Sequence, residues 1–223
     1  MPATKIQHWS YSSLKTFETC AKQWYYSKVK KIPQPPNRYL TRGNEVHNQM
    51  ESYLVGRIER PRVDTDLGFL TDLLHQLEGY EDLVVEEMWH YDLDWQWLGT
   101  EFTYESWLLA KMDAVSLDAR HIVDWKTGRI YDDHAEQARL YALAAASRTF
   151  ETEWKVDMVY IDQEQIITHE IDASDLAGAQ DRWGKRAKQI FNALKDSQFP
   201  KTPSRGCKRC PYNATKGGPC DEG

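Results

Sequence analysis

The stretch Trp107–Tyr141 reads WLLAKMDAVSLDARHIVDWKTGRIYDDHAEQARLY and contains the pattern that decides the fold. Two apolar runs, WLLAKMDAV and RHIVDW, flank the short turn LDAR, and each has the length of a strand. Each run carries one carboxylate, Asp113 in the first and Asp124 in the second. Strand periodicity places Lys126 on the same face as Asp124, with Trp125 on the opposite face. Charged groups at the ends of core strands are costly unless they are paired or bind a metal, so the stretch predicts a polar site.

Downstream of these strands, Gln137 and Tyr141 are spaced i and i+4 on a predicted helix, which places them on one face.

Pro33, Pro35 and Pro36 end the first predicted helix, for which Ser10 or Ser12 is the N-cap. The alternation in the last predicted strand suits a sheet edge. Periodicity predicts helices over residues 10–31, 38–56, 65–80, 132–149 and 173–198 (capped by Ser174 or Asp175), and strands over 83–98, 155–162 and 165–172.

Charge is unevenly distributed along the 223 residues, whose formal net charge is −6. Residues 1–57 carry nine Lys/Arg and three Asp/Glu, and residues 182–223 carry ten and three. The intervening segments are acidic, so the two ends would form a basic lobe able to neutralise phosphates if they meet in space. The alternative to a phosphate-binding lobe is that the charge is segregated by chance and that both ends are solvated helices. No run is long enough to span a bilayer and no signal peptide is visible, so the expected location is the cytoplasm, bacterial or of a virus-infected host.

The four cysteines predict a metal centre. Cys207, Cys210 and Cys220 lie in a Pro/Gly-rich segment near the C-terminus, while Cys20 lies in the first predicted helix. A reducing compartment disfavours two disulfides. Four thiolates fit a structural Zn²⁺ site and fit an iron–sulfur cluster equally well, and the spacing alone does not separate them.

The tryptophans on the predicted strands have two interpretations. The tryptophans Trp89, Trp95, Trp97 and Trp107 are expected in the core rather than as base-stacking platforms, because large aromatic side chains dominate cores.

Four motifs in this order resemble those of the PD-(D/E)XK nuclease superfamily, specifically its RecB-like branch. The resemblance covers roughly residues 10–220 and implies a restriction-endonuclease-like fold, in which a central mixed β-sheet is flanked by helices. It also implies one nuclease domain over 1–223, with a catalytic core at about 37–172 and a lobe from 10–31 and 173–223. The matching motifs are Gly43-x-x-x-His47, Asp113, Asp124-Trp125-Lys126 and Gln137-x-x-x-Tyr141.

The resemblance implies a role for each matching residue. His47, Asp113, Asp124 and the carbonyl of Trp125 would hold Mg²⁺ or Mn²⁺. Lys126 would orient the attacking water and stabilise negative charge. Gln137 and Tyr141 would position water or the DNA backbone. Either Glu86 or Glu87 could join the site from its strand, because the family often has a Glu there; the alternative is a solvent-facing position.

The cysteine layout resembles that of iron–sulfur members of the branch, such as the CRISPR-associated exonucleases and the AddB subunit. It implies a [4Fe–4S] cluster on Cys20, Cys207, Cys210 and Cys220 that joins the two ends of the chain. The nine residues between Cys210 and Cys220 are a departure from the family pattern.

The implied function is a metal-dependent DNA exonuclease for single-stranded or frayed ends, in repair, recombination or viral DNA processing. A structure-specific or nicking endonuclease and a non-catalytic iron–sulfur DNA-binding subunit are the alternatives. No Walker motif is present, so no helicase activity is expected.

Overall fold

The computed structural model describes residues 6–221, and the chain divides into two compact units. Met1–Asn37 and Asp181–Gly223 contribute to the first unit, and Arg38–Gln180 form the second. Within residues 6–221, none of the helices combines the length and the apolar content that crossing a membrane requires.

The second unit is built on a six-stranded sheet with the order β2-β1-β3-β4-β5-β6. Only β4 and β5 are parallel; the other neighbours are antiparallel. The alternating strand β6 lies at a sheet edge, as predicted. The strands are β1 (Val84–Tyr91), β2 (Trp97–Gly99), β3 (Leu108–Ser116), β4 (His121–Lys126), β5 (Trp154–Tyr160) and β6 (Gln165–Ile171).

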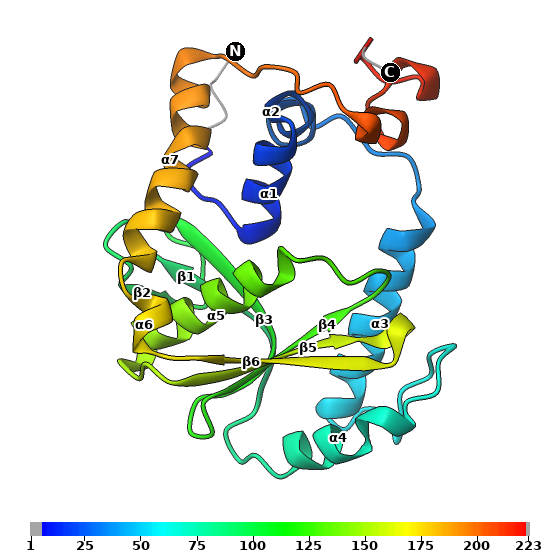
Figure 1. The fold of residues 1–223 in the computed structure, drawn as a ribbon, viewed down its shortest axis with the longest axis vertical. Coiled ribbons are helices and arrows are strands. Elements are labelled where there is room, and N and C mark those ends of the chain that lie inside the picture. Colours follow the sequence, from blue (N-terminus) through cyan, green and yellow to red (C-terminus); the bar gives the residue numbers. More distant parts are fainter. Residues whose placement is uncertain (1–5, 222–223) are drawn as a thin grey trace. The chain divides into compact units, whose positions relative to one another are not determined.

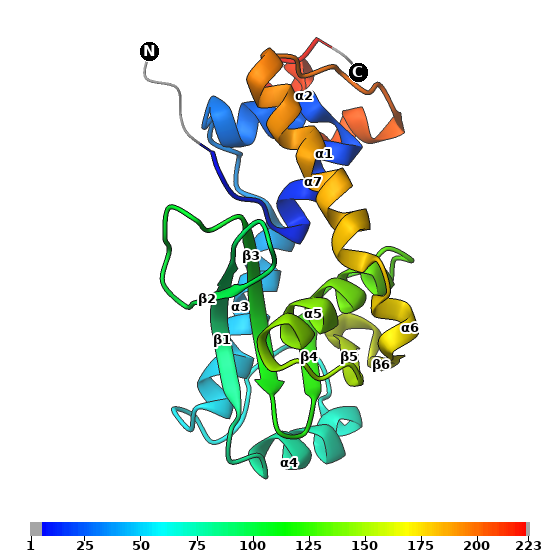
Figure 2. The same ribbon diagram turned by 90° about the vertical axis from the view of Figure 1, so that its left-hand side faces the viewer.

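Helices cover both faces of the sheet (Figures 1 and 2). On one face, α3 (Arg38–Leu54), the 3₁₀ turn η2 (Gly68–Leu70) and α4 (Thr71–Glu78) pack against a cluster that contains Val123 and Trp125. Full burial of a Trp side chain such as Trp125 stabilises a fold by about 3–5 kcal/mol relative to Ala. The opposite face is covered by α5 (His134–Thr149), which is followed by the short α6 (Ala173–Leu176). The prediction of a mixed sheet flanked by helices is therefore confirmed.

The central strands β3 and β4 pair over only three positions, from Ser116 opposite His121 to Ala114 opposite Val123. Beyond Ala114 and Val123 the two strands diverge, and Figure 1 shows them opening into a fork. β4 continues along β5 on its other side as far as Lys126. The six strands therefore still form one sheet, although β3 and β4 separate at its centre. The backbone N–H and C=O groups that face the fork need partners other than a neighbouring strand.

The first unit contains α1 (Tyr11–Thr19), α2 (Ala21–Trp24), the π-helical turn η1 (Tyr25–Val29) and most of α7 (Ala179–Asp196). Ser10 caps α1, as predicted: its side chain accepts a hydrogen bond from Ser13 N. The prediction of one continuous helix over 10–31 is wrong, because Cys20 is extended, with φ −162° and ψ 107°.

The prediction of one helix over 173–198 is also wrong. The chain breaks between α6 and α7 at Gly178, whose φ of +63° does not continue a right-handed helix. The expected caps, Ser174 and Asp175, lie two and three residues too late: Asp172 caps α6 by accepting hydrogen bonds from Ser174 N and Asp175 N.

The C-terminal segment folds back on itself after the short turns η4 (Arg205–Arg209) and η5 (Ala214–Lys216). Cys220 N donates to Tyr212 O at 2.9 Å, and Ala214 N donates to Cys220 O at 2.6 Å. A Cβ at Gly218 would lie 2.2 Å from the Tyr212 carbonyl carbon, so only glycine permits this approach. The nine residues between Cys210 and Cys220 therefore form a loop that brings Cys220 back beside Tyr212 and Ala214.

The tryptophans follow the core prediction with one exception. Trp89, Trp95 and Trp107 are buried, whereas Trp97 on the edge strand β2 is 40% exposed. The guanidinium of Arg148 lies over the rings of both Trp89 and Trp97, 4.6 and 4.3 Å from their centroids. Trp97 is thus held by a cation–π contact at the edge of the sheet.

A buried polar network links β4, β5 and β6 through His121 and Asp157. His121 Nε2 lies 2.8 Å from Asp157 Oδ2, and Thr168 donates to Asp157 Oδ1 at 2.6 Å. Burial alone would raise the pKa of Asp157, but hydrogen bonds from His121, Thr168 and Lys155 outweigh it and lower the pKa to about 2.

We expect Asp157→Asn to lower the free energy of unfolding at pH 7 by about 2 kcal/mol. This is the stabilisation that corresponds to lowering the pKa of the Asp157 carboxyl from its ordinary value to about 2. A carboxylate with a lowered pKa stabilises the fold above its unfolded pKa, and this stabilisation is lost as the pH falls from about 4 toward 2. Urea titrations between pH 3 and 7 should show the wild-type and variant curves converging on the acid side. Asp118→Asn, on an exposed turn, is the matched control. A constant difference at every pH would contradict the assignment.

Candidate active site

The fork between β3 and β4 holds the two carboxylates that the sequence singled out. Asp113 projects from β3 at the point where pairing stops, and its Oδ2 accepts a hydrogen bond of 2.8 Å from Trp125 N. The carboxylate thereby replaces the missing strand partner of that N–H. Asp124 and Lys126 follow on β4, with 2.6 Å between Asp124 Oδ2 and Lys126 Nζ. The three side chains meet where the sheet opens.

Helix α3 and strand β1 contribute the neighbouring groups. His47 Nδ1 lies 3.1 Å from Glu86 Oε1 and 3.3 Å from Asp113 Oδ1. Glu86 has a φ of +53°, an uncommon left-handed value for a residue inside a strand. Glu87 belongs to a different environment, because its carboxylate accepts a hydrogen bond from Trp89 Nε1 and lies near Arg148. Of the two glutamates, Glu86 is the one beside the site.

Helix α5 lines the other side of the β4 residues. Gln137 Oε1 accepts a hydrogen bond of 2.9 Å from Lys126 Nζ. Gln137 Nε2 donates to Tyr141 Oη at 2.8 Å and approaches Asp124 Oδ1 at 3.3 Å. One amide therefore holds both members of the Asp124–Lys126 pair, and the i, i+4 spacing on α5 brings Tyr141 to it.

Acidic and basic groups balance one another in this pocket. Burial alone would lower the pKa of His47, but hydrogen bonds to Asp113 and Glu86 raise it to about 10. Burial raises the pKa of Asp124 to about 6; Lys126 opposes this and Asp113 adds to it. Burial would also raise the pKa of Glu86, yet His47 and Lys111 together lower it. The cationic partners thus hold clustered carboxylates in place.

The sequence model of the PD-(D/E)XK nuclease superfamily matches residues 8–215 of the chain. The chain belongs to the PD-(D/E)XK nuclease superfamily. The match spans both compact units and includes the forked sheet on which Asp113, Asp124 and Lys126 lie.

Solved structures add a likeness in fold. A crystal structure of a protein from Eubacterium rectale, named "Putative exonuclease", superposes with a TM-score of 0.55 at 15% identity, over 91% of this chain and 87% of that one. The crystal structure of SSO0001 has a TM-score of 0.46 at 14% identity, over 98% of this chain and 87% of that one. No curated protein matches the sequence.

The donor set of the candidate active site fits a divalent cation. One ligand atom from each of His47, Glu86 and Asp113 lies within 4.8 Å of the others. Asp124 Oδ2 is buried and accepts no well-directed hydrogen bond, although Lys126 Nζ is close. Imidazole nitrogen and carboxylate oxygens together suit Mg²⁺ or Mn²⁺. The Trp125 side chain is buried in the core, and a metal contact from its carbonyl stays a prediction.

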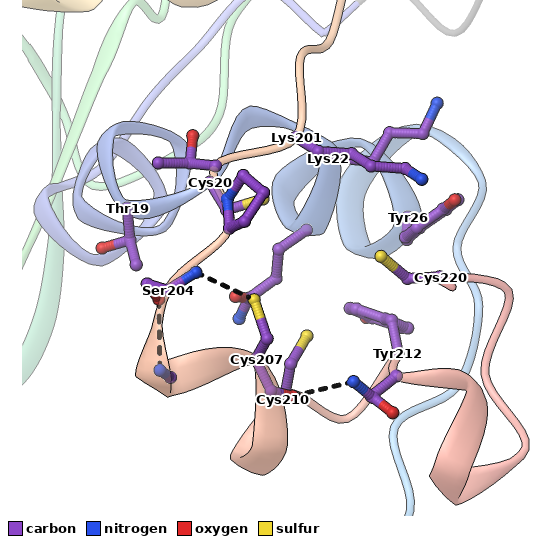
Figure 3. Close-up of a pocket in the computed structure, with 15 residues that line it drawn as sticks. Thr19, Cys20, Lys22, Tyr26, Lys201, Ser204, Cys207, Cys210, Tyr212 and Cys220 are labelled. Carbon is purple, nitrogen blue, oxygen red and sulfur yellow. Dashed lines mark hydrogen bonds between the residues drawn. The ribbon is translucent and has the colours of Figure 1, made fainter. Parts of the chain in front are cut away.

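A second constellation lies in the first unit, where all four cysteines line one cavity of about 80 Å³ (Figure 3). Within the described chain, no three of the four sulfurs lie within 4.8 Å of one another. A single zinc ion with Zn–S bonds of about 2.3 Å needs sulfurs roughly 3.8 Å apart. The four cysteines therefore line one cavity without the sulfur spacing of a mononuclear zinc site.

The cysteine cavity also supplies backbone amides to sulfur. Ser204 N donates to Cys207 Sγ at 3.3 Å, as drawn in Figure 3. Burial raises the pKa of Cys210; the Tyr212 N–H lowers it, and the other three cysteines raise it further. A positively charged metal centre would favour the thiolate form of these clustered cysteines, and the backbone N–H groups would donate hydrogen bonds to the sulfurs.

Sequence reasoning missed Lys111, which forms an ion pair with Glu86 at the mouth of the site. Its alternation with Asp113 along β3 places both on one strand face, which is the signal that could have revealed it. The sequence also left open whether Glu86 or Glu87 reaches the site.

We expect Glu86→Gln to weaken Mn²⁺ binding by about tenfold or more, because it removes one anionic oxygen from the three-residue group. Isothermal titration of the purified protein would measure the affinity. Glu87→Gln is the control, because the Glu87 carboxylate contacts Trp89 and Arg148 and not the site. This variant should bind Mn²⁺ as the wild type does. Equal affinities for both variants would exclude Glu86 as a ligand.

Proposed function

We propose that this PD-(D/E)XK nuclease is a metal-dependent DNA exonuclease of the RecB-like branch, acting on single-stranded or frayed ends in repair, recombination or viral DNA processing. The observation that supports it most is the juxtaposition of the His47–Glu86–Asp113 group with the Asp124–Lys126 pair at the fork. A cation site next to an ammonium group is the arrangement that phosphodiester hydrolysis requires.

A divalent cation, held by His47, Asp113, Asp124 and Glu86, would supply Lewis-acid stabilisation of the scissile phosphate and activate water. In the reaction, a water oxygen adds to phosphorus, the P–O bond to one sugar breaks, the attacking water loses a proton to solvent, and the leaving sugar oxygen gains a proton from solvent. Lys126 donates hydrogen bonds through Nζ, and in our proposal it orients that water and stabilises the charge that develops on phosphate oxygen.

Gln137 and Tyr141 position these groups in the proposed mechanism. The Gln137 amide fixes the Lys126 ammonium by accepting from Nζ at 2.9 Å, which limits the directions in which Nζ donates. Tyr141 orients the amide in turn, since its hydroxyl accepts from Gln137 Nε2. Neither side chain needs to change charge: the pKa of Tyr141 is raised well above its ordinary value by burial and by Asp124.

We expect Asp124→Asn and Lys126→Ala each to reduce cleavage by about 10²–10³-fold, the usual effect of removing a group that stabilises transition-state charge. The measurement is hydrolysis of end-labelled single-stranded and duplex DNA with Mn²⁺ or Mg²⁺, with Asp118→Asn as a control. Circular dichroism would establish that the variants are folded. Full activity in either variant would remove the assignment, and cutting of closed circles would favour an endonuclease.

We further propose that the first unit is a DNA-holding lobe organised by a [4Fe–4S] cluster on Cys20, Cys207, Cys210 and Cys220, in a reducing cytoplasm. Residues 1–37 and 181–223 contain sixteen Lys/Arg and five Asp/Glu, whereas residues 38–180 contain twelve and twenty-nine. The shared cavity and its amide donors support the cluster, and the basic charge supports contact with phosphates. The second unit is then the catalytic core.

We expect Cys20→Ala, purified without oxygen, to lose the brown absorbance and the bound iron, because three thiolates remain of four. Thermal stability and DNA affinity should fall together, since the cluster would fix the basic lobe. Thr19→Ala, which lines the same cavity, serves as the control. Bound zinc in place of iron in the wild type would replace the cluster with a structural zinc site.

A further inference from the structure

Four apolar side chains are exposed beside the candidate active site, on two segments of the second unit. Tyr39 and Leu40 lie in the first turn of α3, and Ile130 and Tyr131 lie in the connection between β4 and α5. Tyr39, Leu40 and Tyr131 are each more than half exposed. We call these four residues the apolar rim. Exposed apolar groups that gather next to a polar site indicate a surface that a ligand covers.

The two segments of the apolar rim are joined by one carboxylate. Asp162 Oδ2 accepts a hydrogen bond of 2.8 Å from Gly128 N in the β4–α5 connection. Asp162 Oδ1 pairs with Arg42 of α3 at 3.1 Å. Thr127 Oγ1 lies 3.5 Å from the position that a Cβ on Gly43 would occupy, so α3 and the connection are in close contact.

The apolar rim leads directly to the residues of the candidate site. On α3, Tyr39, Leu40 and Gly43 precede His47 by eight, seven and four residues, which places all four on one helix face. On the other segment, Tyr131 is five residues beyond Lys126. A strand that lies over the rim would therefore run along the two segments that carry His47 and Lys126.

Tyr131 has the setting of a rigid stacking platform. Its ring meets His134 edge-on, with centroids 5.5 Å apart, and His134 stacks on the buried ring of Tyr160. His134 Nδ1 also lies 2.9 Å from Tyr160 Oη. The ladder supports one side of the Tyr131 ring and leaves the rest exposed, which lowers the entropic cost of stacking a planar group on it.

The charges around the rim are mixed, and one of its cations, Arg38, lies against the ring of Tyr39. The Arg38 guanidinium lies 4.9 Å from the Tyr39 ring centroid and donates to its hydroxyl at 2.9 Å. Arg129 is exposed beside Ile130, while Asp132 is exposed on the other side of Tyr131. Aromatic rings interleaved with arginines match a nucleic-acid strand whose bases are unpaired, because each base offers a π face and each phosphate a negative charge.

From this arrangement we propose that the apolar rim binds the bases of an unpaired DNA strand, with Tyr39 and Tyr131 stacking on them, and so makes the site selective for single-stranded ends. The inference rests on the proposed nuclease function and adds to it the residues that distinguish an open strand from a duplex. Bases inside a duplex are already stacked on their neighbours and cannot occupy both tyrosines.

The test measures binding of fluorescently labelled oligonucleotides by anisotropy in EDTA, where no cation supports cleavage. The substrates are single-stranded DNA, RNA of the same sequence, the DNA duplex, and an abasic strand with the same number of phosphates. Tyr39→Ala and Tyr131→Ala should each weaken binding of single-stranded DNA by about tenfold. Binding of the duplex and of the abasic strand should change little, because neither offers free bases.

Conservative and matched variants complete the design. Tyr39→Phe and Tyr131→Phe keep the ring and should retain wild-type affinity, and Tyr104→Ala removes an exposed tyrosine from the β2–β3 connection and should have no effect. Thermal unfolding of each variant establishes that the exposed substitutions leave the fold intact.

Several outcomes would overturn the inference. If the wild type cuts DNA while the alanine variants bind it unchanged, the rim inference fails and the nuclease function stands. An equal loss on the abasic strand would assign the contacts to phosphate, and a loss confined to RNA would exclude DNA as the stacked strand. A change in oligomeric state in the alanine variants would assign the rim to a second copy. If the wild type neither binds nor cuts any nucleic acid, both proposals fall.

Discussion

The hydrogen bond from Trp125 N to the Asp113 carboxylate is the interaction on which the site depends. Two core strands cannot separate without leaving backbone groups unpaired, and a buried unpaired amide costs about 1–3 kcal/mol. Asp113 removes this cost by acting as the acceptor that β3 no longer supplies. The same carboxylate faces His47, so one residue both permits the fork and contributes to the group inside it.

The opening creates an electrostatic problem that the surrounding helices and strands solve together. Three carboxylates lie close to one another in a setting where charge is poorly screened. His47, Lys111 and Lys126 approach them from α3, β3 and β4, and Gln137 of α5 fixes the last of these. No single element could supply all of these partners, which explains why the site lies where sheet and helices from both faces converge.

Strand and helix periodicity predicted which residues share a face, and this was enough to group Asp124 with Lys126 and Gln137 with Tyr141. Periodicity could not decide between Glu86 and Glu87, because alternation states that they differ and not which one faces the site. The positive φ of Glu86 is set by its tertiary surroundings. The break at Cys20 was missed for a similar reason: local propensity favours helix across it, and the extended conformation there directs the cysteine toward residues almost two hundred positions away.

The cysteine cavity also has a consequence for the order in which the protein is made. Cys20 leaves the ribosome first, and the wall formed by Cys207, Cys210 and Cys220 is translated almost two hundred residues later. At about 5–20 residues per second, roughly 10–40 s separate the first cysteine from the last. During that interval Cys20 is a lone thiol on a nascent chain, and a transcript that stops early yields a polypeptide whose first unit cannot close. The cavity is therefore complete only after translation has passed Cys220.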